Sequence, residues 1–454
     1  MLTHTVSKKP FLLLLATLFC LADSHFCKLY AQTIDTLKLP FAISKEKRLS
    51  DEDLANKKEG AYLTGIPDFS SDPVNGIGIG AEGSLFFNGK RSDPFFAYTP
   101  YRAELDVALF ATTRNQYEAM FTLDVPYIFN TKWRLRAEAG YEKNPNLLYF
   151  GLTEQSLNGL SFYPGGDTAA ALQRNVSYAR YDKNLAAYNP SLNQYIKDEY
   201  ILNVSIEHSY LDGKLRALFG YEIAQVGISL FSGRSKLLED EHTANVLGLG
   251  KNIVTIAQQG LIYDTRDLET DPSVGVFAEL TNELSLQALG SAFNFNKTFF
   301  HYNYYYNVFP KKIKKTVIAM RFAAGYTAGD APFFEYQDQW SSEGSIEGLG
   351  GAYTLRGYKQ SRFLGRVMSF NNLEIRYRIA QTQFLKQQLV ISAVPFADAG
   401  AVWDKLNRVG HFENFRFSEG LGARVVWNIN TVLRFDYAFS PEDKQFFFNL
   451  AHTF

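Results

Sequence analysis

Cysteine and long apolar runs are scarce in this chain of 454 residues. Its two cysteines, Cys20 and Cys27, both lie near the start of the sequence. The chain beyond them therefore offers neither a disulfide framework nor paired thiols for a metal ion. No segment after residue 31 reaches the roughly 18 consecutive apolar residues that a spanning helix needs. The formal net charge of −1 argues against nucleic-acid binding, which requires a basic surface.

Motifs for catalysis and for metal binding are missing as well. The sequence contains no Gly-x-Ser-x-Gly elbow, no His-Glu-x-x-His pair and no paired Cys/His spacing for zinc. The glycine-rich stretch 76–80 lacks a following helix, and the glycines at 350–351 lack the Gly-Lys-Ser/Thr ending of a phosphate-binding loop. We therefore expect no enzymatic activity, no metal ion and no cofactor.

The start of the chain reads as a secretory signal. A basic pair, Lys8-Lys9, precedes a short apolar core at residues 11–21, which is the order found in signal peptides. This core is too short to span a bilayer comfortably as a helix. We expect residues 1–31 to be removed by cleavage after Ala31, with cleavage after Ala22 as the alternative.

A short polar segment, residues 32–59, is expected to follow on the periplasmic side. Its helix-like patch runs from Ser44 to Lys58. About 28 residues are too few for an independent domain. Three roles stay open for this segment: a solvated charged tail, a short plug, or a docking segment.

Aromatic residues and period-two alternation are abundant. Aromatic residues make up 15% of the chain, which is typical of membrane barrels with aromatic girdles. In one stretch Leu433, Phe435 and Tyr437 share one face, whereas Arg434 and Asp436 share the other. Alternation alone also fits a soluble sandwich, but runs of 10–14 residues exceed the usual five or six and match tilted bilayer crossings. Because open sheet edges cannot persist in lipid, such strands must close into a barrel.

Residues 60–454 are therefore expected to form an all-β domain, a 16-stranded antiparallel transmembrane β-barrel. The strands are expected at 60–69, 77–88, 101–112, 115–126, 133–142, 200–210, 214–228, 253–264, 274–286, 293–308, 316–329, 367–379, 389–402, 420–429, 431–439 and 445–454. The even number of strands places both termini on the periplasmic side. The long connections then all fall on the extracellular side, at 143–198, 229–251, 330–366 and 403–417.

The third long connection holds an arginine in an apolar, glycine-rich hairpin. Leu355 and Tyr358 flank Arg356, whose five donors cannot stay buried without acceptors. Two acids on later strands offer acceptors: Glu374 lies on a polar strand face, and Asp398 is a lone acid in an apolar strand. We expect this long extracellular loop to fold into the lumen, where one guanidinium meets both carboxylates.

This hairpin carries a family resemblance. The run Leu355-Arg356-Gly357-Tyr358 resembles the hydrophobic-Arg-Gly-aromatic loop motif of the outer-membrane assembly-factor superfamily, which includes the BamA and TamA insertases and the two-partner-secretion transporters. In that family the loop folds back into a 16-stranded barrel and its arginine contacts acids on the wall. The resemblance implies that Glu374 and Asp398 are those acids. The run Phe396-Ala397-Asp398-Ala399-Gly400 is similar to the family's Phe-x-Asp-x-Gly strand.

A further family signature lies earlier in the chain. It comprises Asp264, Arg266 and Asp267, followed by Pro272 and Gly275. We expect the chain to depart from most relatives by lacking periplasmic POTRA modules before the barrel. It therefore resembles a short member of the family that lacks these modules.

The last predicted strand looks like the C-terminal signal by which bacterial outer-membrane barrels are recognised for insertion. Phe448 and Leu450 are apolar alternate residues, and Phe454 is the aromatic final residue. With the secretory signal, this pattern indicates a barrel in the outer membrane of a Gram-negative bacterium, surrounded by outer-membrane lipids.

Two classes of function compete for such a barrel. The resemblance implies insertion or translocation of polypeptides, or lipids, through a lateral seam between the first and last strands. Gly60, Gly65 and Pro67 in the first strand would weaken that seam, because proline gives no ladder donor. The alternatives are a passive or gated pore and a structural barrel that acts with a separate periplasmic partner. Client polypeptides, a partner subunit and homo-oligomers are the partners considered, and nucleic acid is not expected.

Overall fold

The computed structural model describes residues 38–49, 54–55, 57–72, 76–166, 168–309, 316–384, 387–427 and 431–454. The signal peptide expected at residues 1–31 lies outside the described residues, as does the start of the polar segment that follows it. Residues Leu39–Phe454 form one compact unit that contains all of the strands.

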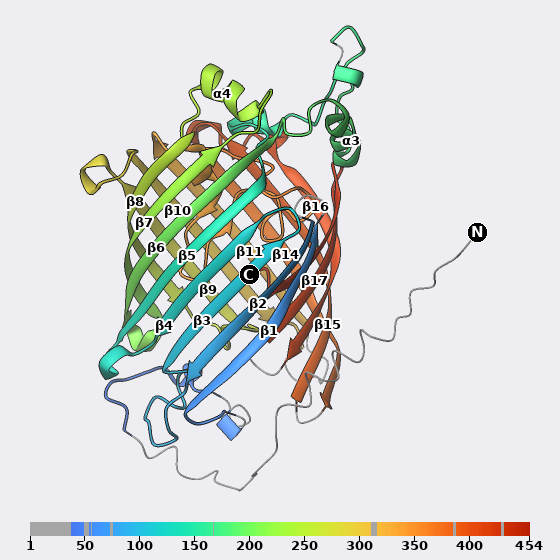
Figure 1. The fold of residues 1–454 in the computed structure, drawn as a ribbon. Coiled ribbons are helices and arrows are strands. Elements are labelled where there is room, and N and C mark those ends of the chain that lie inside the picture. Colours follow the sequence, from blue (N-terminus) through green and yellow to red (C-terminus); the bar gives the residue numbers. More distant parts are fainter. Residues whose placement is uncertain are drawn as a thin grey trace. The chain divides into compact units, whose positions relative to one another are not determined.

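Sixteen strands pair in sequence order in one antiparallel sheet that curls into a barrel (Figure 1). The fold class predicted from the sequence is therefore confirmed. The strands of this sheet are β1 (Ala61–Asp72), β2 (Gly76–Phe87), β3 (Ala103–Thr112), β4 (Tyr117–Val125), β5 (Trp133–Leu148), β6 (Gln194–Tyr210), β7 (Leu215–Ser229), β8 (Gly250–Asp264), β9 (Gly275–Ser285), β10 (Phe295–Asn307), β11 (Thr316–Gly329), β14 (Val367–Phe384), β15 (Gln387–Trp403), β16 (Arg416–Trp427), β17 (Thr431–Phe439) and β18 (Lys444–Leu450).

The strands carry their apolar side chains outward and their charged side chains inward. On β14, Leu373, Ile375 and Tyr377 are each 40% exposed, whereas Glu374 and Arg376 are 0% and 5% exposed. A soluble sandwich would bury the apolar face instead. The outer face therefore suits lipid, and the lumen holds the charges that the alternation placed on one face.

Four long connections lie at one end of the barrel. The other end, which we name the short-turn end, has shorter turns except for residues 88–102 between β2 and β3. The long connections are residues 149–193 with helix α3 (Tyr178–Tyr188), 230–249 with α4 (Lys236–Ala244), 330–366 with the two-residue strands β12 (Asp338–Gln339) and β13 (Ile346–Glu347), and 404–415. Figure 1 shows α3 and α4 at the same end. The 3-10 turns are η3 (Lys45–Lys47), η4 (Ile128–Asn130), η5 (Thr153–Leu157), η6 (Pro164–Gly166), η7 (Leu211–Gly213), η8 (Gln287–Leu289), η9 (Phe333–Tyr336), η10 (Leu406–Arg408) and η11 (Phe412–Asn414). Across the described ranges, every helix is too short or too polar to cross a bilayer.

The connection between β11 and β14, residues 330–366, folds back into the lumen, and we name it the lumen loop. Its Leu349, Leu355 and Tyr358 are buried and pack against Phe299 and Phe370 of the barrel wall. Burial of these apolar side chains removes them from water and gives the loop a core of its own. The loop predicted to enter the lumen does so.

Several predicted strand boundaries are wrong. β5 continues to Leu148 rather than residue 142, β6 begins at Gln194 rather than residue 200, and β14 continues to Phe384 rather than residue 379. The last strand was expected to run to Phe454, but β18 ends at Leu450 and Ala451 takes a left-handed φ of 62°. The physical reason is that buried arginines in the lumen attract the polar end of the chain, as described below. In the patch from Ser44 to Lys58, the structure describes a 3-10 turn at Lys45–Lys47 and helical residues 54–55, and residues 50–53 and 56 lie outside the described residues, so a helix over the whole patch stays a prediction.

The two end strands of the sheet are β1 and β18. The pairing ladder runs from β1 through every strand to β18. Among the described residues, no hydrogen-bonded ladder joins β18 back to β1. The strands on either side of this seam are therefore each held by one neighbour.

Candidate functional site

The tip of the lumen loop is a glycine-dependent hairpin. Gly350 and Gly351 have φ values of 114° and 91°, which non-glycine residues rarely adopt. A Cβ atom on Gly350 would lie 2.0 Å from the carbonyl oxygen of Lys359. The buried hydroxyl of Thr354 accepts a hydrogen bond from the Gly350 N–H at 2.9 Å. This local network presents the following residue pair, Leu355 and Arg356, to the barrel wall.

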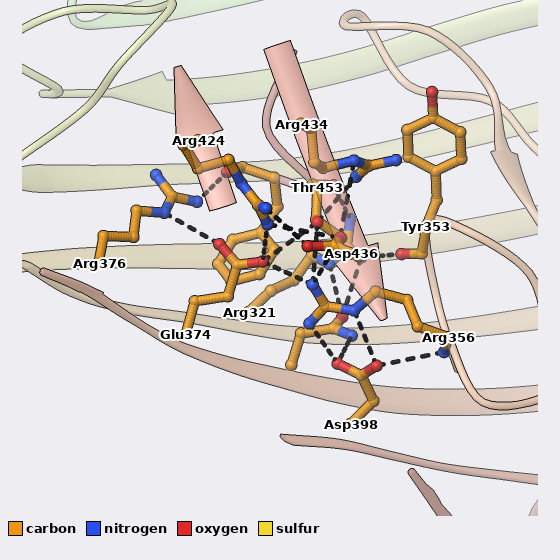
Figure 2. A network of polar contacts seen from close by, with 12 residues as sticks. Arg321, Tyr353, Arg356, Glu374, Arg376, Asp398, Arg424, Arg434, Asp436 and Thr453 are labelled. Carbon is orange, nitrogen blue, oxygen red and sulfur yellow. Dashed lines mark hydrogen bonds and ion pairs between the residues drawn. The ribbon is translucent and has the colours of Figure 1, made fainter. Parts of the chain in front are cut away.

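Arg356 lies at the centre of the site and is fully buried (Figure 2). Its Nε and Nη2 donate to the two carboxylate oxygens of Asp398 on β15, at 2.9 and 2.7 Å. Its Nη1 donates to Glu374 Oε1 on β14 at 2.7 Å and to Asp436 Oδ2 on β17 at 3.3 Å. Burial by itself would lower the pKa of Arg356, but the carboxylates of Asp398, Glu374 and Asp436 outweigh it and raise that pKa above its ordinary value.

Other residues of the sequence motifs pack around Arg356 and allow the loop to lie against the wall. The Phe396 ring lies 3.5 Å from the Arg356 guanidinium carbon, a cation–π distance. A Cβ on Gly400 would lie 3.1 Å from the Leu349 side chain, and one on Gly357 would lie 2.6 Å from the backbone of β17. These glycines therefore let the loop approach the wall closely.

Four more arginines surround Arg356. Together with Arg356 of the lumen loop and its three carboxylates they form the lumen cluster. Its wall members are Arg321 on β11, Glu374 and Arg376 on β14, Asp398 on β15, Arg424 on β16, and Arg434 and Asp436 on β17. Five arginines face three carboxylates, so neutral oxygens must satisfy the surplus donors. Arg321 accordingly donates to Asn372 Oδ1 at 3.0 Å and to the carbonyl oxygen of Tyr353.

The end of the sequence supplies more of these oxygens. We name residues 451–454 the tail. Thr453 Oγ1 accepts from Arg434 Nη1 at 2.8 Å and donates to Glu374 Oε1 at 3.1 Å. The carbonyl oxygens of Thr453 and Phe454 accept from Arg321 Nη1 and Arg376 Nη2 at 3.2 and 2.8 Å. The tail therefore belongs to the site.

The residues expected to form the C-terminal signal lie in different places. Phe448 points outward from β18 and is 41% exposed. Phe454 packs in the lumen with its ring 6.4 Å from that of Tyr305. Leu450 is the last residue of β18. Their role as a recognition signal stays a prediction.

The earlier signature forms a second polar group at the short-turn end. Asp264 is fully buried and accepts from Arg266 Nε at 3.1 Å. Asp267 instead accepts from the backbone N–H of Ser273 at 2.8 Å and so shapes the β8–β9 turn. A Cβ on Gly275 would lie 2.3 Å from a backbone oxygen of that turn, which accounts for the glycine.

The sequence did not single out the other members of the lumen cluster as site residues. Alternation placed Arg376, Arg434 and Asp436 on lumen-facing positions, but nothing local indicated that they meet Arg356. Arg321 and Arg424 carried no motif. Across the described ranges, no group of three or more His, Cys, Asp or Glu side chains is placed to hold a metal ion. The arrangement is suited to holding a loop.

Two family models match the chain. A model for the "Omp85 superfamily domain" matches residues 80–454. A second model, described as "Domain of unknown function (DUF5982)", matches residues 39–102. The second match spans the N-terminal polar segment, β1, β2 and the turn to β3.

One curated protein resembles most of the chain in sequence. The outer membrane protein assembly factor BamA of Nitratidesulfovibrio vulgaris is 25% identical over 392 residues, which cover 80% of this chain and 46% of the relative. The chain thus spans about half the length of that relative.

Two solved structures share the fold. BamA from Haemophilus ducreyi lacking POTRA domains 1–3 matches 87% of this chain and 70% of its own, with a TM-score of 0.50 and 13% identity. CdiB from Escherichia coli matches 86% of this chain and 62% of its own, with a TM-score of 0.52 and 10% identity.

Proposed function

Because this chain belongs to the Omp85 superfamily, we propose that its barrel inserts or translocates polypeptides, or lipids, through a lateral seam between β1 and β18. The barrel is an outer-membrane protein of a Gram-negative bacterium. We propose that it acts on client polypeptides or with a periplasmic partner. We also propose that the chain divides into a signal at residues 1–31, a polar segment at 32–59 and the barrel from residue 60.

The seam is the observation that carries this proposal. No ladder joins β1 to β18 among the described residues, whereas each other neighbouring pair in the sheet is hydrogen-bonded. Unpaired strand edges are templates for pairing with another chain. A client strand can therefore add to either edge by backbone hydrogen bonding, which is how β-augmentation works.

Both seam strands have features that keep their mutual pairing weak. Pro67 lies within β1 and has no N–H to donate. β18 has only seven residues, against twelve in β1. At Ala451, which still donates to β17, the chain turns into the lumen, so residues 452–454 cannot extend the seam.

A reversible disulfide across the seam tests the proposal. Leu63→Cys on β1 combined with Ala451→Cys beside the end of β18 locks the seam, and the sequence beyond Cys27 contains no other cysteine. The protein is reconstituted in liposomes, and the folding rate of a small eight-stranded outer-membrane barrel is measured with and without reductant. We expect the oxidised variant to lose most of its stimulation and the reduced variant to regain it.

The matched control shares one of these cysteines. Leu63 pairs with Leu85 in the β1–β2 ladder, so Leu63→Cys with Leu85→Cys forms a disulfide that leaves the seam free. This control should stay active when oxidised. Equal activity of the open and locked seam would contradict the proposal and favour a pore or a structural barrel.

A further inference from the structure

The N-terminal polar segment docks along the short-turn end of the barrel. We name residues 39–49 the rim segment. Its Phe41 ring lies 5.5 Å from the ring of Phe95 in the β2–β3 turn and 5.6 Å from Tyr127 in the β4–β5 turn. The N–H of Ser44 donates to the carbonyl oxygen of Asp212 in the β6–β7 turn at 2.8 Å. The rim segment therefore contacts three successive turns through ring packing and backbone hydrogen bonds.

The 3-10 turn of the rim segment directs one lysine to a fourth turn. Lys47 Nζ donates to Asp264 Oδ2, at the end of β8, at 3.0 Å. It also lies 3.9 Å from Glu269 in the β8–β9 turn. The Lys47 side chain is 18% exposed and the Asp264 side chain is fully buried. The two charges are thus largely desolvated, which strengthens their interaction.

Asp264 is connected to the lumen loop through Arg266. Its carboxylate accepts from Arg266 Nε and Nη2 at 3.1 and 3.3 Å. Arg266 Nη2 also donates to Glu343 of the lumen loop. Lys47, Asp264, Arg266 and Glu343 therefore form a chain of alternating charge from the rim segment to the loop, and we name it the rim relay.

Wall residues hold the neighbouring part of the loop. Ser341 Oγ and the Ser342 N–H donate to Glu279 of β9 at 2.6 and 3.0 Å. Arg136 Nη1 of β5 donates to the carbonyl oxygen of Ser342 at 2.7 Å. Glu343 differs from these residues because its contact leads back to the rim segment.

We propose that the rim segment is a built-in docking partner of the barrel and that Lys47 is a positioning residue for the lumen loop, acting through Asp264 and Arg266. Without Lys47, the carboxylates of Asp264 and Glu343 compete for fewer cations. Glu343 is 38% exposed, so it is the acid that moves into water at least cost. This inference goes beyond the proposed transport function and does not depend on it.

Labelling of the loop tests the relay in the full-length barrel purified in detergent. Ser345 is exposed and lies two residues from Glu343, so Ser345→Cys reports on loop release through its reaction rate with a polar maleimide. We expect Lys47→Ala to raise that rate about two- to thirtyfold, the range of coupling through such networks. Lys47→Arg should keep the rate low because it preserves the charge.

Control variants separate the relay from a general loss of structure. Lys45→Ala alters an exposed lysine in the same 3-10 turn and should leave the labelling rate unchanged. Lys47→Gln, which removes only the charge, is measured alongside so that the coupling stays measurable if Lys47→Ala does not fold. Retained heat-modifiable migration on gels identifies the folded variants.

A double-mutant cycle decides whether the two ends of the relay communicate. Lys47 and Glu343 both act through Arg266, so the double variant Lys47→Ala/Glu343→Gln should label no faster than the faster single variant. Two outcomes overturn the proposal: an unchanged rate in both Lys47→Ala and Lys47→Gln, or a double variant whose rate increase equals the product of the single increases.

Discussion

Arg356 places all three of its guanidinium nitrogens on carboxylates from three different strands. Nε and Nη2 contact Asp398, and Nη1 contacts Glu374 and Asp436. Only a planar guanidinium serves several carboxylates in this way, because lysine carries its charge on one nitrogen. The partners are not equally dependent on Arg356. Glu374 also accepts from Arg376 and Arg424 at 2.9 and 3.0 Å.

Substitution of Arg356 should free the lumen loop without unfolding the barrel. Removing one partner of a buried ion pair costs about 3–5 kcal/mol, and we expect the lower end because Glu374 keeps its other arginines. Arg356→Ala should speed proteolysis near Tyr358 and increase conductance in planar bilayers. Arg356→Lys should rescue only partly, and Asp398→Asn should give a milder form of the same change.

A control variant and a double variant are measured by the same proteolysis and conductance assays. Arg378→Ala alters a lumen-side arginine that donates to Gln381, and it should leave both proteolysis and conductance unchanged. Arg356→Ala combined with Asp398→Asn should be less than additive, because both changes break one contact. Strict additivity would mean that the contact does not hold the loop.

The tail links an edge strand of the sheet to the lumen cluster. The Ala451 N–H still donates to the carbonyl oxygen of Val432 on β17 at 2.9 Å, so the ladder ends there. Thr453 then lies between Arg434 and Glu374. Because β18 borders the seam, any movement of this strand strains the tail and the cluster that holds it.

Substitution of Thr453 tests how far the cluster depends on the tail. Thr453→Ala removes the acceptor of fully buried Arg434, and leaving a buried donor unsatisfied costs about 1–3 kcal/mol. The free energy of unfolding, measured by urea titration with gel mobility as the readout, should fall by about that amount. Thr453→Ser keeps the hydroxyl and should stay close to the original protein. Equal loss in both variants would show that the hydroxyl does not matter.

The whole barrel is an inverted protein, apolar outside and charged inside. The lumen loop, the lumen cluster and the tail contact one another in its lumen. A sheet of this kind is stable only when lipid or detergent covers its outer face. The seam and the lumen cluster are connected through β18, because β18 forms one edge of the seam and continues into the tail, whose Thr453 contacts Arg434 of β17.

Heat should change the electrophoretic mobility of the protein. A folded membrane barrel resists dodecyl sulfate at room temperature and migrates as a compact species, whereas boiling exposes the whole chain and slows it. We expect the unboiled protein from outer-membrane fractions to run faster than the boiled sample. A soluble product whose migration is the same before and after boiling would contradict the membrane barrel.

The strand count and the direction of the side chains were predictable from the sequence, because they depend on local alternation. Leu433 and Arg434 face opposite sides of β17 whatever the rest of the chain does, since the side-chain period of a strand is two. The need of Arg356 for acidic partners was equally readable, because a buried guanidinium requires acceptors. The end of the barrel at which each connection lies was also predictable, because successive connections between antiparallel strands alternate between the two ends.

Only the tertiary structure decided which of these charges meet. Arg321 and Arg424 come from β11 and β16, and curvature of the sheet brings them to one point of the lumen. Lys47 reaches Asp264 across 217 positions of the sequence, and the left-handed Ala451 turns the tail inward. No local pattern encodes such contacts, because they depend on the register of many strands at once and on the shape of the lumen that the strands enclose.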